Sequence, residues 1–246
     1  MIIQSLQNPK IKHLQQLQNK KYRYTHQEFI AQGFKTCKSL LSANFTLKSI
    51  FMTESNYLQH QDDFLINETY LVTDEIMQKI STTITPTGIV GIFAMKQHDF
   101  IVTTNSAAFV QIQDPGNLGT LIRSACAMGL EAVYIVDSVD VYSPKVIQAT
   151  TGTLAHIKFI TCSWDILKSH MKSISLCALI VNSDKKPEDI DLKNSILVVG
   201  NEGQGLSEHI IGQCATHMTI PMKGHAESLN AAVAGSIAMY LKSQDK

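Results

Sequence analysis

Arginine is scarce in this sequence, whose 246 residues include nineteen lysines but only two arginines, Arg23 and Arg123. A planar guanidinium binds a phosphate through two parallel hydrogen bonds, which the point charge of a lysine cannot reproduce. The two positions that hold arginine are therefore candidate phosphate contacts, although chance alone could also place two residues there.

Cysteine is sparse as well. The five cysteines are an odd number without any C-x-x-C pair, and three of them lie in apolar runs. This pattern argues against a disulfide framework or a zinc site and is typical of reduced thiols in a cytosolic protein. The histidines of the C-terminal half also lack metal-binding spacing, so we expect no metal. Among them are His156, His209, His217 and His225.

Long hydrophobic runs are absent. No apolar stretch reaches the ~18 residues that a membrane span needs, and the polar residues 1–18 do not resemble an export signal. We therefore expect a cytoplasmic protein. Its hydrophobic content of 44% suffices for one large core or two small ones, and we expect two domains.

Net charge is zero, but the charges are unevenly distributed along the chain. Residues 1–50 carry eight lysines or arginines and a single acid, Glu28, whereas the remainder carries thirteen basic and twenty acidic side chains. The basic end is a candidate RNA-binding arm, in which we expect Lys20, Lys21 and Arg23 to contact RNA. The alternative is a basic helical face that is only solvated.

Three glycine-containing stretches share one design. Residues 114–125 (DPGNLGTLIRSA) and 198–207 (VVGNEGQGLS) each follow a short β-type run, pass through a turn and enter a helical pattern. Residues 220–230 (IPMKGHAESLN) form an irregular loop before an Ala-rich helix, with Ser228 as the expected N-cap. This layout predicts a ligand at the carboxyl ends of parallel strands. Each loop by itself could equally be a simple turn before a helix.

In this order and spacing, the three stretches resemble the motifs of the SpoU (TrmH-like) branch of the SPOUT RNA methyltransferases. The resemblance covers residues 109–241. It implies S-adenosylmethionine as the cofactor, a homodimer, and transfer of a methyl group to a ribose 2′-hydroxyl of RNA.

We expect a two-domain α/β protein. Residues 1–95 are similar to the small L30e-like RNA substrate-binding domain of part of this family, with a first helix over residues 8–19, and polar residues 96–106 are predicted to be a linker. In residues 107–246, apolar strands alternate with helices, which predicts a parallel sheet covered on both faces. Pattern alone suggests a doubly wound Rossmann-like fold. The resemblance implies a SPOUT domain with a deep trefoil knot, which periodicity does not indicate.

The resemblance assigns the cofactor to the second and third motifs. There, glycines would let the backbone approach the ligand, and backbone amides with apolar side chains would hold the adenine. The expected cofactor-binding residues are Gly200, Asn201, Gly203, Gly205, Ile220, Met222 and Leu229. The glycines could instead serve turn geometry only.

The resemblance places the catalytic arginine at Arg123. Because a guanidinium is not deprotonated in proteins, we expect it to clamp the adjacent RNA phosphate and to stabilise the developing alkoxide. Asn117 and Glu202 are expected to orient this arginine, and Ser228 and Asn230 to line the space between cofactor and ribose. Glu202 could instead be an acid at a helix N-terminus.

Three positions depart from the family pattern. Gln32 replaces a glutamate in the L30e-like domain, Gln148 replaces an arginine, and Ala232 replaces a residue with a hydroxyl. The L30e-like domain favours ribosomal RNA as the substrate, with methylation of tRNA as the alternative. A non-catalytic RNA-binding protein with the same fold is a further alternative, but the five expected catalytic residues are all present and favour an active enzyme.

Overall fold

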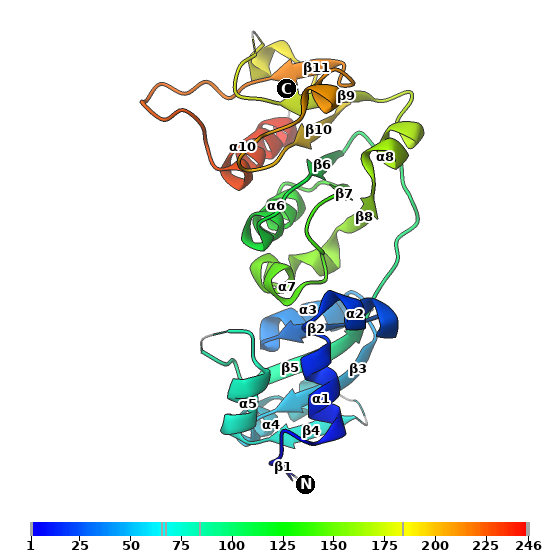
Figure 1. Cartoon of the computed structure of the whole chain (residues 1–246), viewed down its shortest axis with the longest axis vertical. Helices are drawn as coiled ribbons and strands as arrows, with labels where there is room; N and C mark the ends of the chain where they lie inside the picture. Colours follow the sequence, from blue (N-terminus) through cyan, green and yellow to red (C-terminus); the bar gives the residue numbers. More distant parts are fainter. Residues whose placement is uncertain (1, 65, 67, 84, 184, 245–246) are drawn as a thin grey trace. The chain divides into compact units, whose positions relative to one another are not determined.

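The computed structural model describes residues 2–64, 66, 68–83, 85–183 and 185–244. The chain divides into two compact units (Figure 1). One consists of Met1–Lys96 with Tyr142–Ala155, and the other of Gln97–Val141 with His156–Lys246. Residues 142–155, which we expected in the C-terminal domain, therefore group with the N-terminal unit.

The N-terminal unit is built on a mixed sheet of strand order β1-β4-β3-β5-β2. Its strands are β1 (Ile2–Ile3), β2 (Glu28–Gln32), β3 (Leu47–Met52), β4 (Thr69–Val72) and β5 (Ile89–Ala94). Its helices are α1 (Pro9–Gln16), α2 (Lys20–His26), α3 (Phe34–Ser42), α4 (Glu54–His60), α5 (Asp74–Ile80) and α7 (Pro144–Thr150), with 3₁₀ turns η1 (Gln61–Asp63) and η2 (Thr153–His156). Strand β5 is antiparallel to both of its neighbours, which makes the sheet mixed.

Two capped helices stand where the sequence predicted one. Helix α1 follows the cap Asn8 and ends at Gln16, so the expected helix over residues 8–19 stops early. The side chain of Asn19 then accepts a hydrogen bond from the backbone N–H of Lys21, 2.9 Å away, and starts α2. The basic cluster is thus a helix of its own, because an Asn in front of it satisfies its first amides.

Helix α7 completes the N-terminal unit. It packs against β2, with Val146 and Ile147 buried. The Tyr142 ring centroid lies 4.8 Å from that of Phe29, and the Ser39 hydroxyl donates a hydrogen bond of 3.0 Å to the carbonyl of Gly152. These contacts make residues 142–155 part of this unit's core, although they lie between two strands of the other unit in the sequence.

The C-terminal unit contains a six-stranded sheet of order β11-β9-β10-β6-β7-β8. The strands are β6 (Ser106–Val110), β7 (Ala132–Val136), β8 (Lys158–Cys162), β9 (Ser175–Leu179), β10 (Ser195–Val199) and β11 (Thr216–Met218). All neighbouring pairs are parallel, as the strand pattern predicted. The chain builds β6, β7 and β8 outward in one direction and later returns to set β10 against β6. The boundary between β6 and β10 is therefore the switch point at which α/β sheets bind ligands.

The helices of this unit are α6 (Pro115–Ala127), α8 (Trp164–His170), α9 (Glu208–Ile211) and α10 (Ala231–Ser243), with the 3₁₀ turn η3 (Pro187–Asp189). Helices α6 and α10 pack closely, because a Cβ atom at Gly235 would lie 2.5 Å from Leu121 and 3.2 Å from Val199. The hydroxyls of Ser124 and Ser236 join the two helices at 2.7 Å. Of the helices that the structure describes, none is both long and apolar enough to span a membrane.

Candidate functional site

A cavity of about 410 Å³ opens at the carboxyl ends of β9 and β10, beside the switch point. Its size is within the range of small-molecule sites. It is lined by residues that follow β9 (179–182), by the loop after β10 (199–206), and by Ile211, Thr219, Ile220, Met222, Ser228, Leu229, Ala231 and Ala234. The second and third glycine-containing stretches therefore meet around one cavity.

The loop after β10 is folded back on itself. Asn201 and Gly205 pair through two backbone hydrogen bonds of 3.2 and 3.1 Å, and the Asn201 side chain accepts from the amides of Gly203 and Gln204. A Cβ atom at Gly200 would lie 2.6 Å from the backbone of Gly205, a separation that only glycine permits. The glycine at position 200 is thus required by the loop itself.

Glu202 ties this loop to the first stretch. Its carboxylate accepts hydrogen bonds from the backbone N–H groups of Gln113 and Asp114 at 3.3 and 3.2 Å, and from the side-chain amide of Asn117 at 3.1 Å. Desolvation raises the pKa of the Glu202 carboxyl, but a hydrogen bond from its own backbone, together with those from Asn117, Gln113 and Asp114, lowers the pKa below its ordinary value. The carboxylate therefore stays ionised, and its hydrogen bonds link the second stretch to the first.

Asn230 joins the third stretch to the same group. Its side-chain N–H donates to the Asn117 carbonyl oxygen at 3.2 Å, while its own carbonyl oxygen caps α10 by accepting from the amides of Ala232 and Val233. Helix α10 thus begins after Asn230, and the expected N-cap at Ser228 is wrong by two residues. The Asn117 side chain is thus hydrogen-bonded to both Glu202 and Asn230.

The loop from Ile220 to Leu229 has few constraints. None of these described residues makes a hydrogen bond with another described residue, and residues 223–228 are exposed. Figure 1 shows this orange loop between β11 and α10 extending away from the sheet of its unit. Its inner side nevertheless lines the cavity through Ile220, Met222, Ser228 and Leu229. The loop therefore presents free backbone groups and apolar side chains beside the cavity.

Comparison with known proteins agrees with this geometry. Residues 105–240 match the model of the SpoU rRNA Methylase family, and residues 8–91 match the MRM3-like substrate binding domain. The chain belongs to the SpoU rRNA methylase family. This confirms the resemblance that the three stretches predicted.

Several relatives of the SpoU family match the chain over nearly its whole length. It is 27% identical to the 23S rRNA (guanosine(2553)-2′-O)-methyltransferase RlmP of Bacillus subtilis (strain 168), over 97% of each chain. The crystal structure of an RNA 2′-O ribose methyltransferase is 27% identical and superposes with a TM-score of 0.87, covering 98% of each chain. The AdoMet-bound rRNA methyltransferase of Sinorhizobium meliloti, 24% identical, shares the fold with a TM-score of 0.86, covering 98% of this chain and 97% of that one.

Arg123, the expected catalytic arginine of this SpoU domain, lies exposed on α6. Within the described part of the chain its guanidinium makes no hydrogen bond or ion pair, and Glu202 bonds Asn117 instead. Six residues separate Asn117 from Arg123, which corresponds to about 9 Å along the helix and a different face. The expectation that Asn117 and Glu202 orient Arg123 is therefore not met by a direct contact.

Arg23 does not occupy the surface on which RNA contact was expected. Its side chain is 3% exposed, and its Nη1 donates hydrogen bonds to the carbonyls of Leu17 and Gln18 at 2.9 and 2.7 Å. A guanidinium satisfies two such carbonyls at once, so it joins the end of α1 to α2. Lys20 and Lys21 beside it are exposed.

The sequence did not reveal the segment that follows β9. Residues 179–182 line the cavity, and Asn182 brings a side-chain amide to its exposed rim. The available signal was the position of this segment at the carboxyl end of a strand beside β10. Among the described residues, no group of three or more His, Cys, Asp or Glu side chains could hold a metal ion.

Proposed function

We propose that this SpoU-family protein is an S-adenosylmethionine-dependent methyltransferase that methylates a ribose 2′-hydroxyl of ribosomal RNA. The observation that supports this most is the convergence of the three motifs, through Asn117, Glu202 and Asn230, beside one cavity at the switch point of the sheet. The similarity to the 23S rRNA 2′-O-methyltransferase of Bacillus subtilis supports the same reaction and the same class of RNA.

The cavity suits S-adenosylmethionine. Ile220, Met222 and Leu229 supply apolar walls for the adenine, and the backbone of the 220–229 loop has unused hydrogen-bonding groups. A flat, neutral base is held well by such main-chain bonds and apolar contacts. The loop of Gly200, Asn201, Gly203 and Gly205 forms the opposite wall in this proposal. When bound, this cofactor supplies the electrophilic methyl group.

In this proposal the Arg123 guanidinium binds negatively charged oxygens of the RNA. Its guanidinium stays protonated, is exposed and has no competing partner among the described residues, so it is available to an RNA phosphate and to the oxygen that develops negative charge. Ser228 and Asn230 line the approach of the ribose. Glu202 acts one step away, by fixing the Asn117 side chain that holds Asn230.

The proposal includes several finer features of the family. They are an L30e-like character of the N-terminal domain, a deep trefoil knot in the C-terminal domain, a division of the sequence into residues 1–95, 96–106 and 107–246 in which residues 142–155 pack with the N-terminal unit, a cytoplasmic location, and a homodimer. Val233 and Tyr240 on α10 are 47% and 50% exposed, which supports an interface on this helix. Light scattering should give twice the chain mass of 27.2 kDa.

Two of the three departures from the family pattern, Gln32 and Ala232, do not favour a non-catalytic protein. The Gln32 side chain has a structural use, because it donates to the Thr82 hydroxyl at 2.9 Å and accepts from the Ser81 hydroxyl at 3.0 Å. Ala232 contributes its backbone N–H to the Asn230 cap, which needs no side chain. Methylation of tRNA remains the competing function and is tested by offering both RNA classes.

Calorimetry with a matched pair of glycine variants tests the cofactor site. Gly200→Ala should abolish binding of S-adenosylmethionine, since the added methyl group would collide with the backbone of Gly205. Gly224→Ala should bind normally, because a Cβ atom there meets nothing within 4 Å. Wild-type protein that binds neither the cofactor nor its demethylated product would refute the proposed function.

A further inference from the structure

A shallow groove crosses the joint between α1 and α2 in the N-terminal unit. Its volume is about 580 Å³, and it is lined by Lys12, Gln15, Gln16, Gln18, Asn19 and Tyr22. The lining contains no acidic residue and only one aromatic ring, that of Tyr22, which is 37% exposed. The groove is therefore a polar, basic surface with a flat apolar face inside it.

Three of the side chains that line the groove have hydrogen-bonding groups without a partner among the described residues. Within the part of the chain that the structure describes, the side-chain amides of Gln15 and Gln16 and the hydroxyl of Tyr22 make no hydrogen bond. Each amide offers both a donor and an acceptor. A face for stacking beside mixed donors and acceptors is what proteins use to recognise an unpaired nucleobase.

Hydrogen bonds hold together the two helices that form the groove. The buried guanidinium of Arg23 donates to the carbonyls of Leu17 and Gln18, and the side chain of Asn19 caps α2. The two helices are thus fixed relative to each other. A ligand would meet a preformed surface and would spend little binding free energy on ordering it.

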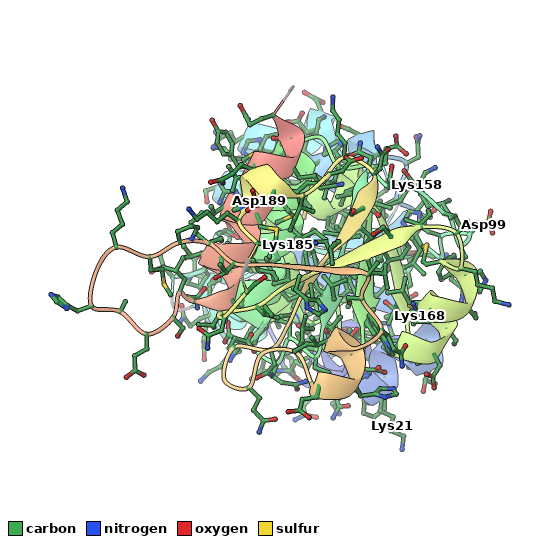
Figure 2. The ribbon with its side chains drawn as sticks, turned by 90° about the horizontal axis from the view of Figure 1, so that it is seen from above. Lys21, Asp99, Lys158, Lys168, Lys185 and Asp189 are labelled. Carbon is green, nitrogen blue, oxygen red and sulfur yellow. The ribbon has the colours of Figure 1, made fainter. Side chains whose placement is uncertain are left out.

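The charge around the groove fits a nucleic acid. Lys12 lies on its wall, and Lys20 and Lys21 begin the helix that carries Tyr22. Figure 2 shows the Lys21 side chain pointing outward from its helix. Residues 1–50 contain eight basic residues and one acid, so phosphates are attracted to this end of the chain.

We propose that this groove binds an unpaired segment of the substrate RNA, with Tyr22 stacked on a base and the amides of Gln15 and Gln16 bonded to its edge. Lys12 and Lys21 hold the flanking phosphates. A duplex is excluded because its bases are already stacked and paired. The inference rests on the proposed function in taking RNA as the substrate, and it adds which surface and which form of RNA are involved.

Fluorescence anisotropy on the full chain tests the groove, with a short mixed-sequence single-stranded RNA and an RNA duplex of equal phosphate number as probes. Wild-type protein should prefer the single strand. Tyr22→Ala should weaken that binding by about 5-fold to about 100-fold, whereas Tyr22→Phe keeps the ring and should bind nearly as wild type. Lys12→Gln should flatten the dependence of log affinity on log salt by about 1.

Tyr24→Ala is the matched control, because Tyr24 is an exposed ring on the same helix that does not line the groove. It should leave the affinity unchanged. Equal binding by Tyr22→Ala and wild type, or a preference for the duplex, would overturn the inference. Calorimetry with S-adenosylmethionine keeps the two proposals apart, since failure of the groove leaves cofactor binding intact and failure of the proposed function does not.

Discussion

The substitution Glu202→Gln changes the carboxylate that links the first and second motifs and leaves the shape of the side chain nearly the same. Oε1 of Glu202 accepts from Asp114 N and the Asn117 amide, and a glutamine oxygen can keep both bonds. Oε2 accepts from Gln113 N at 3.3 Å, and in the variant an NH₂ group would face that N–H. Because solvent reaches this site, we expect a loss of about 1–2 kcal/mol rather than the full penalty of a buried charged hydrogen bond.

The variant should also bind S-adenosylmethionine about tenfold more weakly, since a loss of 1.4 kcal/mol in loop positioning corresponds to that factor. The melting temperature of the variant should be about 2–8 °C below that of the wild type, as expected for a chain of this length. The pH dependence has a defined sign. The folded-state pKa of Glu202 is lowered, so its stabilisation is present above the unfolded value of about 4.3 and is lost as pH falls through the folded value.

The assay measures the melting temperature, and by calorimetry the affinity for S-adenosylmethionine, of Glu202→Gln and of the control variant Glu208→Gln. Glu208 lies exposed in the first turn of α9 and its side chain makes no hydrogen bond with other described residues, so its variant controls for loss of charge alone. The difference in stability between wild type and Glu202→Gln should disappear in acid. If both variants behave alike at neutral pH, the reasoning that Glu202 joins the motifs is wrong.

Three further substitutions test individual residues. Arg123→Lys should slow single-turnover methyl transfer by on the order of 10² while cofactor affinity and melting stay unchanged, and a near-normal rate would rule out a role for the planar guanidinium. Arg23→Lys should lower the unfolding free energy by about 1–3 kcal/mol in urea, because the carbonyls of Leu17 and Gln18 lose donors, and an unaltered midpoint would contradict this. Burial lowers the pKa of Lys242 to about 8, so unfolding free energy should rise with pH from about 8 to about 10, and Lys242→Met should lack this rise.

The sequence predicted the parts of the site that depend on local pattern. Strand, turn and helix signals placed Asn117, Glu202 and Asn230 at the ends of elements in one parallel sheet, and the structure brings these three side chains together. Parallel strands share one carboxyl edge, so residues that follow them must lie close to one another. This is why distant positions in the sequence could be assigned to one site.

Tertiary packing determined what the sequence did not predict. The sequence gives no reason to treat Arg23 and Arg123 differently, because no periodicity distinguishes them. In the structure Arg23 is buried and donates to backbone carbonyls, whereas Arg123 is exposed. Helix α7 has an ordinary amphipathic pattern, which cannot specify that its buried face packs on β2. The hydrogen bond of Asn230 to Asn117 likewise depends on the register between α10 and α6.

Methyl transfer from isotopically labelled S-adenosylmethionine tests the central proposal most directly. Purified protein would be incubated with ribosomal RNA and, separately, with tRNA from cells that lack it, and the digested nucleosides would be analysed by mass spectrometry. We predict label in a 2′-O-methylated nucleoside from ribosomal RNA and none in tRNA. Label on a base, or no transfer by a protein that binds the cofactor, would contradict the proposal.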